Sequence, residues 1–466
     1  MRRRFGKPGP SLLKALPSST SFCFILRKHR FRSPVTSPQP DTLILGGGIT
    51  GLLAAWHLQR AGRLVEVWEA SEAGGGWVQT LPWPGPNGEP GHLERGPQGL
   101  RVGRTGALAE LLRDLDLPLE DPAPKGPRWV GKGGQRRPSP ASLKGLLSDP
   151  NLSIGDLLRL LAEPFIGPGP QDENLQAFFA RRLGAGFARE CLPALVAGVL
   201  AAPPECLGLA ALPRLRHLEA KGGLLLGSLR DGPERTRHPV GGMGTLARRL
   251  AERLGCVRLG QGALSLEALS HDRWRVHGTD GAREVARVVL AVPPAAAAAL
   301  LEAPAPAAAQ LLGAIPALDL RVWHSRHAPV PGWERGFGLL IQPPEGHGLL
   351  GAVALAADDP RGVPGLLQVR TYLGGAYPLA ADLTAWPGVF QALRRWLPEL
   401  GEPVQVREEP CPGAFPLLAP GHDTRLAQLD GVLPQGLHWL GAARSGPGLP
   451  DLAEAIAAWA KTLTAT

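Results

Sequence analysis

The sequence has no long apolar segment, because it contains no uncharged run of 18 or more apolar residues. A transmembrane helix needs such a run, so none is predicted. Cysteine is also scarce. The five cysteines form no CxxC pair and have no spacing that suits a metal ion, which argues against a zinc site and predicts reduced, buried thiols. They are Cys23, Cys191, Cys206, Cys256 and Cys411.

Side-chain patterns that carry acid–base or nucleophilic catalysis are absent as well. The twelve histidines take part in no HExxH motif and in no Ser-His-Asp arrangement, and no paired carboxylates stand out. We therefore predict no catalytic side chain and no metal site.

Acidic residues are missing from the first 40 positions, which contain nine basic ones. Since the whole chain carries a net charge of +9, residues 41–466 are formally neutral. The basic character belongs to this leader, and nucleic-acid binding is not predicted. An Arg-rich, acid-free leader is typical of an organellar transit peptide. The favoured interpretation is instead a disordered bacterial extension or a wrongly chosen start site.

The most informative motif follows the leader. Thr42–Leu45 reads as a short buried strand, Gly51–Ala61 has helical spacing and Leu64–Trp68 reads as the next strand. The turn between the first strand and the helix fits GxGxxG, whose glycines let the backbone approach a pyrophosphate at the helix N-terminus. An acid at the end of the second strand can accept hydrogen bonds from ribose hydroxyls. The predicted contacts are Gly46, Gly47, Gly48, Ile49, Thr50, Gly51 and Glu69.

Two further glycine-rich segments favour FAD over other dinucleotides. Glu69–Trp77 is similar to the second glycine patch of the amine-oxidase and protoporphyrinogen-oxidase flavoproteins, where small residues let the chain pass near the flavin. Gly441–Asp451 follows a predicted strand and precedes a helix, which places a second helix N-terminus where a flavin could lie.

With these segments, the chain resembles the oxygen-dependent protoporphyrinogen oxidases over nearly all of residues 41–460. Trp77 replaces the arginine common among amine oxidases, and Leu93–Arg101 is similar to the family's E-x-GPRGIR segment. Further matches are Phe178–Gly184, Val196–Val199, Gly241–Leu246 and Val289–Pro293. Besides the glycine turn and Glu69, the resemblance implies FAD contacts from Trp77, Gly96, Pro97, Gln98, Gly99, Ala263, Ala442, Pro447, Gly448 and Leu449.

The resemblance also implies a substrate site. Arg128 is expected to hold a propionate carboxylate, since a guanidinium binds carboxylates in bidentate fashion and keeps its charge. Gly198 would allow close backbone approach, and Phe337, Leu340 and Tyr372 would form apolar walls. The sequence leaves open a solvated loop arginine at position 128 and ordinary core roles for the three apolar residues.

Three positions depart from the family pattern. The family arginine after Gly-Pro is Gln98, an acidic or amide position is Pro203, and a late Pro-Gln-Tyr motif reads Pro416–Leu418. A catalytically silent or retuned member therefore stays open as an alternative.

The expected fold is α/β, with a discontinuous Rossmann-type FAD domain, a helical, membrane-associating domain and a mixed α+β substrate domain. Apolar patches at 158–166 and 222–229 are interpreted as core, with contact to a membrane surface as the alternative. The expected boundaries are a leader at 1–40, the FAD domain at 41–104, 236–300 and 405–466, the helical domain at 105–235 and the β-rich substrate domain at 301–404.

The function implied by the resemblance is FAD-dependent oxidation of protoporphyrinogen IX by O2, in three two-electron steps that yield hydrogen peroxide. The alternatives are a coproporphyrinogen III oxidase of the same family, an amine oxidase-like flavoenzyme and a non-catalytic flavin- or tetrapyrrole-binding protein. The expected partners are the porphyrinogen and O2, with peripheral membrane contact and a homodimer as further expectations. The expected location is the cytoplasm, or the mitochondrial inner membrane if the leader is a transit peptide.

Overall fold

A five-stranded parallel sheet lies at the centre of the nucleotide-binding part of the protein. The computed structural model describes residues 40–121, 126–139, 152–231, 235–343 and 345–464. Thr42–Leu45, the first of these strands along the chain, is buried at all four positions, as expected for a parallel strand that is covered on both faces. In spatial order the strands are Val257–Arg258 (β10), Val65–Trp68 (β2), Thr42–Leu45 (β1), Arg287–Leu290 (β14) and Leu437–Trp439 (β20).

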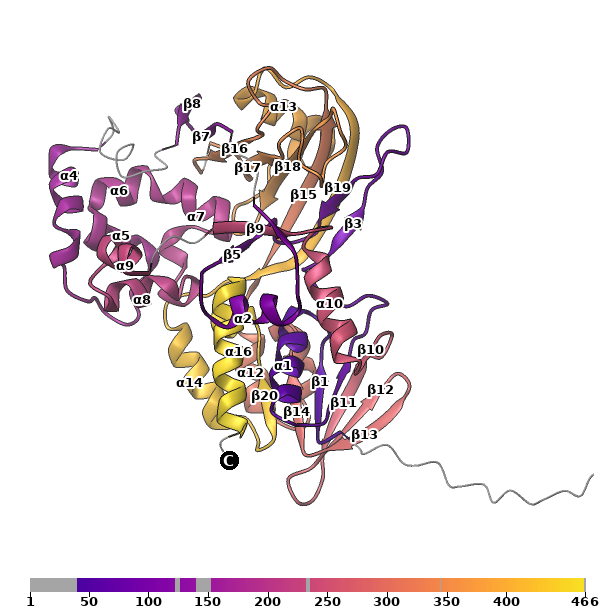
Figure 1. The fold of residues 1–466 in the computed structure, drawn as a ribbon. Coiled ribbons are helices and arrows are strands. Elements are labelled where there is room, and N and C mark those ends of the chain that lie inside the picture. The colour runs from indigo at the N-terminus through magenta and orange to yellow at the C-terminus, as the bar shows by residue number, and fades with distance from the viewer. Residues whose placement is uncertain (1–39, 122–125, 140–151, 232–234, 344, 465–466) are drawn as a thin grey trace, which may run out of the picture. The chain divides into compact units, whose positions relative to one another are not determined.

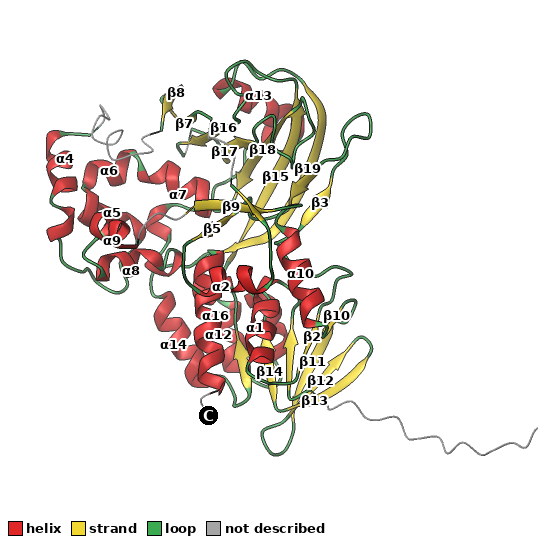
Figure 2. Ribbon diagram, in the orientation of Figure 1, coloured by secondary structure: helices red, strands yellow, loops and turns green. Residues whose placement is uncertain are grey.

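Helices pack against this sheet, and Figure 2 shows Ile49–Arg60 (α1) beside its strands. One face, which includes Ile44, Val67 and Val289, shares its core with α1, Ala107–Asp114 (α2), Gly244–Leu254 (α10) and Leu449–Thr464 (α16). The other face, which includes Leu43 and Leu45, belongs to a core cluster that also contains residues of a three-stranded antiparallel sheet and of Pro294–Leu301 (α11), Pro306–Gly313 (α12) and His422–Val432 (α14). The predicted α/β class is confirmed.

Three small antiparallel sheets accompany the parallel one. The first consists of Ala263–Ala268 (β11), Trp274–Gly278 (β12) and Gly281–Val285 (β13). The second is the hairpin of Thr80–Pro82 (β3) and His92–Glu94 (β4). The third contains Leu100–Val102 (β5), Arg235–Pro239 (β9) and Leu119–Glu120 (β6).

A seven-stranded sheet forms the second large layer (Figure 1). All of its pairs are antiparallel except β16 with β7. Trp386–Trp396 (α13) and the 3-10 turn Ala381–Thr384 (η4) cover one face with an apolar core. In order the strands are Pro403–Pro416 (β19), Ala317–His327 (β15), Leu367–Gly374 (β18), Leu349–Ala354 (β17), Phe337–Ile341 (β16), Arg128–Lys132 (β7) and Gln135–Pro138 (β8).

A group of short helices lies between residues 154 and 231. One of them, Leu192–Leu200 (α7), packs against β16 and β17 of the seven-stranded sheet. The other helices are Ile154–Leu161 (α4), Leu175–Leu183 (α5), Ala185–Glu190 (α6), Arg214–Ala220 (α8) and Leu224–Asp231 (α9), with 3-10 turns at Glu163–Phe165 (η1), Pro204–Cys206 (η2) and Leu209–Ala211 (η3). None of the helices in the described ranges is long and apolar enough to cross a bilayer.

Two segments belong to other elements than expected. Residues 105–235 were predicted to be mainly helical, yet 128–138 forms β7 and β8 at the edge of the seven-stranded sheet. Residues 405–416 were assigned to the FAD domain, yet they form most of β19, which pairs with β15 of the same sheet. In both cases pairing with a strand far away in the sequence decides where the segment lies.

The apolar patches at 158–166 and 222–229 are only partly buried, so their interpretation as core is wrong for several side chains. Leu160 faces inward with an exposed fraction of 3 %, whereas four residues spaced along one side of α4 and η1 point to solvent. Leu229 of the second patch is also 77 % exposed. The four residues, which we call the α4 stripe, are Ile154 (78 %), Leu158 (62 %), Leu161 (60 %) and Phe165 (89 %).

Candidate FAD and substrate sites

The turn between β1 and α1 has the geometry of a pyrophosphate cradle. Gly46 has a φ of +107°, and a Cβ there would lie 2.5 Å from the carbonyl oxygen of Ala291. A Cβ at Gly51 would lie 1.9 Å from the carbonyl oxygen of Gly46, so strand and helix approach as closely as the motif requires. Gly48 caps α1 without any side-chain hydrogen bond. The first amides of the helix therefore remain available to an anion.

Glu69 directly follows β2 and lies beside this turn. Its Oε2 accepts a hydrogen bond from the backbone N–H of Gly47 at 2.7 Å, and its Oε1 accepts one from the N–H of Ser71 at 2.9 Å. The Glu69 carbonyl accepts from the N–H of Gln261 at 2.8 Å, two residues before Ala263 at the start of β11. The carboxylate and the predicted Ala263 contact thus lie along one edge of the sheet, where a ribose would bind.

The second glycine patch runs alongside the first turn. The N–H of Gly75 donates to the carbonyl of Gly47 at 2.8 Å, and Gly75 forms an isolated bridge with Gly48. Trp77 follows, and a Cβ at Gly96 would lie 2.2 Å from its carbonyl oxygen. The patch thereby connects the pyrophosphate cradle to the predicted flavin contacts Gly96, Pro97, Gln98 and Gly99.

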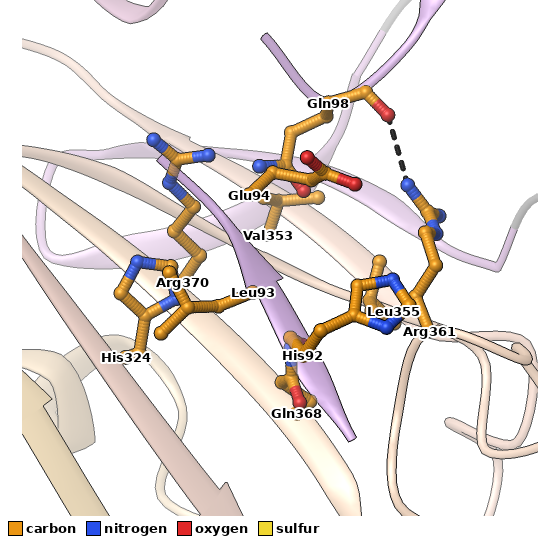
Figure 3. Close-up of a pocket in the computed structure, with 10 residues that line it drawn as sticks. All are labelled: His92, Leu93, Glu94, Gln98, His324, Val353, Leu355, Arg361, Gln368 and Arg370. Atoms are coloured by element: carbon orange, nitrogen blue, oxygen red, sulfur yellow. Dashed lines mark hydrogen bonds between the residues drawn. The ribbon is translucent and has the colours of Figure 1, made fainter. Parts of the chain in front are cut away.

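The turn at residues 95–99 is held from behind by arginines. Arg370 of β18 donates to the carbonyls of Arg95 at 2.9 Å and Gly96 at 2.8 Å. Arg361 donates to the carbonyl of Gln98 at 2.8 Å (Figure 3) and is itself paired with Asp359 at 2.7 Å. Neither arginine is among the site residues predicted from the sequence. The signal that could have indicated a buried role is that Arg370 is the one charged residue in the strand segment Leu367–Gly374.

Figure 3 shows a small cavity behind this turn, lined by strands of the β3–β4 hairpin and the seven-stranded sheet. Burial and the nearby arginines hold the pKa of His324 well below its usual value, so its ring is neutral. Burial raises the pKa of Glu94, whose carboxylate accepts from the N–H of Met243 ahead of α10. Four nitrogens around the cavity have no hydrogen-bond partner: Nε2 of His92, Gln98 and His324, and Nε of Arg370.

The C-terminal segment returns to the same edge of the parallel sheet. It leaves β20, which pairs with β14, and enters the short helix Ala442–Ser445 (α15). The Nε2 of His422 lies 2.6 Å from the carbonyl oxygen of Ala443, and this contact holds the helix in place. The remaining predicted contacts, Pro447, Gly448 and Leu449, immediately precede and begin α16.

Arg128 lies on β7, next to Gly338 of β16. A Cβ at Gly338 would lie 2.6 Å from the Arg128 Cδ, so the side chain crosses that glycine. The only hydrogen bond recorded for the guanidinium goes to the carbonyl of Pro127, and no carboxylate pairs with it among the described residues. Burial lowers the pKa of Arg128. A half-buried cation without a counter-ion is suited to an anionic ligand.

The structure brings three of the other substrate candidates to one side of the seven-stranded sheet. A Cβ at Gly198 on α7 would lie 2.2 Å from the Leu340 Cδ2. Tyr372 and Trp77 pack against a small apolar cluster that contains Ala197 of the same helix. Phe337 is different, because it is fully buried on the opposite face of β16, against Trp129 and Trp333. Its side chain therefore belongs to the core and not to this wall.

No group of three or more His, Cys, Asp or Glu side chains in the described ranges could hold a metal ion. The four cysteines within these ranges are free thiols, and Cys206 is exposed, contrary to the expectation of burial. Burial raises the pKa of Cys256 to about 11. Cys23 and the expected leader lie outside the described residues, apart from Pro40.

The donor set fits FAD. A glycine turn with uncapped helix amides matches a pyrophosphate, a strand-end carboxylate matches a ribose, and the two later glycine segments meet the same sheet edge. This arrangement supplies binding and orientation, while oxidation and reduction are chemistry of the cofactor.

Comparison with known proteins agrees with this geometry. The family model for flavin-containing amine oxidoreductases matches residues 49–451. Human protoporphyrinogen oxidase is 32% identical over 381 residues, covering 72% of this chain and 77% of the human protein. Coproporphyrinogen III oxidase of Propionibacterium freudenreichii subsp. freudenreichii is 29% identical, with 90% of each chain covered.

A solved structure shows the same fold. Cyclohexylamine oxidase from Brevibacterium oxydans aligns with a TM-score of 0.68 at 21% identity, covering 92% of this chain and 99% of the other. The predicted oxidoreductase class and FAD cofactor are confirmed by the family match. The chain belongs to the family of flavin-containing amine oxidoreductases.

Proposed function

We propose that this protein oxidises protoporphyrinogen IX to protoporphyrin IX, with O2 as the electron acceptor. Relatives named for porphyrinogen oxidation, among them the human protoporphyrinogen oxidase, support porphyrinogens as the substrate class. The full oxidation removes six electrons, hence three two-electron cycles that each yield one hydrogen peroxide. FAD held by the glycine turn and Glu69 would supply the two-electron chemistry, with O2 as the final acceptor, so the protein has to hold the macrocycle and exclude water.

The observation that carries this proposal is the unpaired Arg128 beside an apolar wall. Leu340 and Tyr372 offer a surface for the tetrapyrrole ring, and the closeness of Gly198 to Leu340 leaves room for no larger residue at that position. The Arg128 guanidinium can bind a propionate at the edge of such a ring in bidentate fashion.

The arrangement of charges favours protoporphyrinogen over coproporphyrinogen III. Protoporphyrinogen has two propionates and coproporphyrinogen four, so the latter calls for more cationic anchors. Arg370, which stacks on Tyr372, already donates to two carbonyls, and Arg95, which stacks on Trp77, pairs with Glu409 at 3.2 Å. Among these three arginines, Arg128 is the one whose guanidinium has no counter-charge or pair of carbonyls.

Side-by-side turnover tests the proposal. The FAD-loaded protein is mixed anaerobically with protoporphyrinogen IX, coproporphyrinogen III or cyclohexylamine, and the flavin absorbance is followed before and after air is admitted. We expect protoporphyrinogen IX to bleach the flavin band and air to restore it with porphyrin fluorescence. Bleaching only by coproporphyrinogen III, or only by the amine, would replace the proposal by the corresponding alternative. No bleaching by any of them would favour a non-catalytic binding protein.

Replacing Arg128 by alanine is expected to raise the KM for protoporphyrinogen by about ten- to a hundredfold, because a charge-assisted bond to carboxylate contributes roughly 1.5–3 kcal/mol. The kcat should change much less, since the guanidinium holds a remote propionate. Steady-state kinetics measure both constants. The matched control is Arg137→Ala on the adjacent strand β8, and an unchanged KM in Arg128→Ala would remove this residue from the substrate site.

We further propose that the α4 stripe lies on a membrane surface. Figure 1 shows α4 at the outer edge of the helical group, and its four side chains present an apolar strip to solvent. Leu158→Ser combined with Phe165→Ser is expected to raise the lipid concentration for half-maximal liposome binding at least about tenfold, since each buried apolar side chain contributes roughly 1.5–3 kcal/mol. Val404→Ser, at a distant exposed apolar residue, is the control. Equal binding of both variants would contradict the proposal.

A further inference from the structure

Arg370 reaches from the seven-stranded sheet to the turn that contains the predicted flavin contacts Gly96–Gly99. Its two terminal nitrogens donate to consecutive carbonyls, those of Arg95 and Gly96, at 2.9 and 2.8 Å. This fork fixes the orientation of both peptide groups at once, because a guanidinium is planar and its donors are rigidly spaced. The turn is therefore held at its first two residues by a side chain of β18.

The charge of Arg370 is unusual for its surroundings. The side chain is 6 % exposed, and no ion pair joins it to a carboxylate in the part of the chain that the structure describes. Arg361, which holds the same turn at Gln98, differs because Asp359 lies 2.7 Å from it and balances its charge. Hydrogen bonds to carbonyl oxygens offset only part of the free energy that is lost when a cation is removed from water. Arg370 thus places a buried cation without an ion-pair partner behind the turn.

The cavity of Figure 3 supports this view of the charge. Arg370 lies beside His324, its partner in the strand register, and the unpartnered Nε of the arginine and Nε2 of the histidine both belong to the cavity wall. Glu94 is the one carboxylate that lines this cavity. It accepts hydrogen bonds from the N–H of Met243 and the hydroxyl of Thr80. Arg361, the other arginine of this wall, is balanced by Asp359, so Arg370 is the arginine of the wall that forms no ion pair among the described residues.

We propose that Arg370 is a positioning residue for the flavin, which fixes the turn at Gly96–Gly99 and adds a positive charge that favours reduction of the cofactor. A fixed cation near a flavin stabilises its reduced, more electron-rich form. The inference rests on the FAD contact proposed for this turn, but not on the identity of the oxidised substrate. It gives the buried arginine two separable effects, one from its fork geometry and one from its charge.

Two substitutions separate these effects. Arg370→Lys keeps the charge and loses the fork, so the FAD dissociation constant should rise about three- to tenfold for a lost hydrogen bond, while the flavin potential stays near that of the unaltered protein. Arg370→Met loses both. Its bound flavin should become harder to reduce by about tenfold in the equilibrium constant, which corresponds to about 30 mV for a two-electron couple.

The measurements are FAD affinity by fluorescence quenching and flavin potential by equilibration with a reference dye, neither of which needs a porphyrinogen. Arg321→Met is the matched control, because it removes an arginine from the same sheet that is paired with Glu408 away from the cavity. The inference is overturned if Arg370→Met keeps the potential of the unaltered protein. Should Arg370→Met not fold, an unchanged FAD affinity in Arg370→Lys overturns it. If Arg370 variants shift the potential while no porphyrinogen is oxidised, only the proposed function fails.

Discussion

Gly46→Ala is expected to yield a colourless protein that retains its fold but binds FAD at least about a hundredfold more weakly. Two independent costs act at this position. The backbone has a φ of +107°, which costs an L-residue roughly 1–2 kcal/mol. In addition, the new Cβ would lie 2.5 Å from the carbonyl oxygen of Ala291, so β1 and β14 would have to separate at the turn. Displaced amides can no longer converge on the pyrophosphate.

Gly62→Ala is the control that separates the cost of a positive φ from the cost of the steric clash. Gly62 also has a positive φ, of +77°, but a Cβ there would have no atom within 4 Å. We expect this control to lose only about 1 kcal/mol of stability and to bind FAD normally. Flavin absorbance after purification and a titration of the apoprotein measure the difference. Normal FAD content in Gly46→Ala would show that the turn at β1 is not the pyrophosphate site.

The β1–turn–α1–β2 unit could be predicted from sequence because all of its determinants are local. A buried strand, a glycine turn, a helix and an acid follow one another within residues 42–69, and the structure has each of them within two residues of the predicted bounds. The β7–β8 hairpin also had a local signal that was missed. Gly133 and Gly134 form a two-residue turn between the strands, both with positive φ, as hairpin turns require.

Other features depend on contacts between distant residues. Pairing of β7 with β16 joins Arg128 to Gly338, more than 200 positions later, and no local pattern encodes that register. Phe337 and Leu340 could have been separated, since residues three apart on a strand face opposite sides, but only once the strand was recognised. The role of Arg370 requires knowledge of which carbonyls lie opposite it, and that depends on the whole fold.

Replacing Arg182 by methionine is expected to destabilise the helical group by about 3–5 kcal/mol, because it strands a buried carboxylate. Glu163 is fully buried and Arg182 is 1 % exposed, with a distance of 3.0 Å between them. Glu163 also accepts hydrogen bonds from the amides of Leu224 and Leu225 at the start of α9. The pair therefore ties η1, α5 and α9 together, and hydrogen exchange across residues 154–231 measures its loss.

Two further variants test the cause. Arg189→Met removes an arginine that is 70% exposed and paired with Glu190, and such a surface pair contributes only about 0–1 kcal/mol. Glu163→Gln combined with Arg182→Met removes the stranded charge and should recover part of the stability lost in the single variant. If Arg182→Met accelerated exchange no more than Arg189→Met does, the buried ion pair would not be what holds the helices together. Because α7 of this group also carries Gly198, loosening the group should raise the KM for the porphyrinogen as well as the exchange rates.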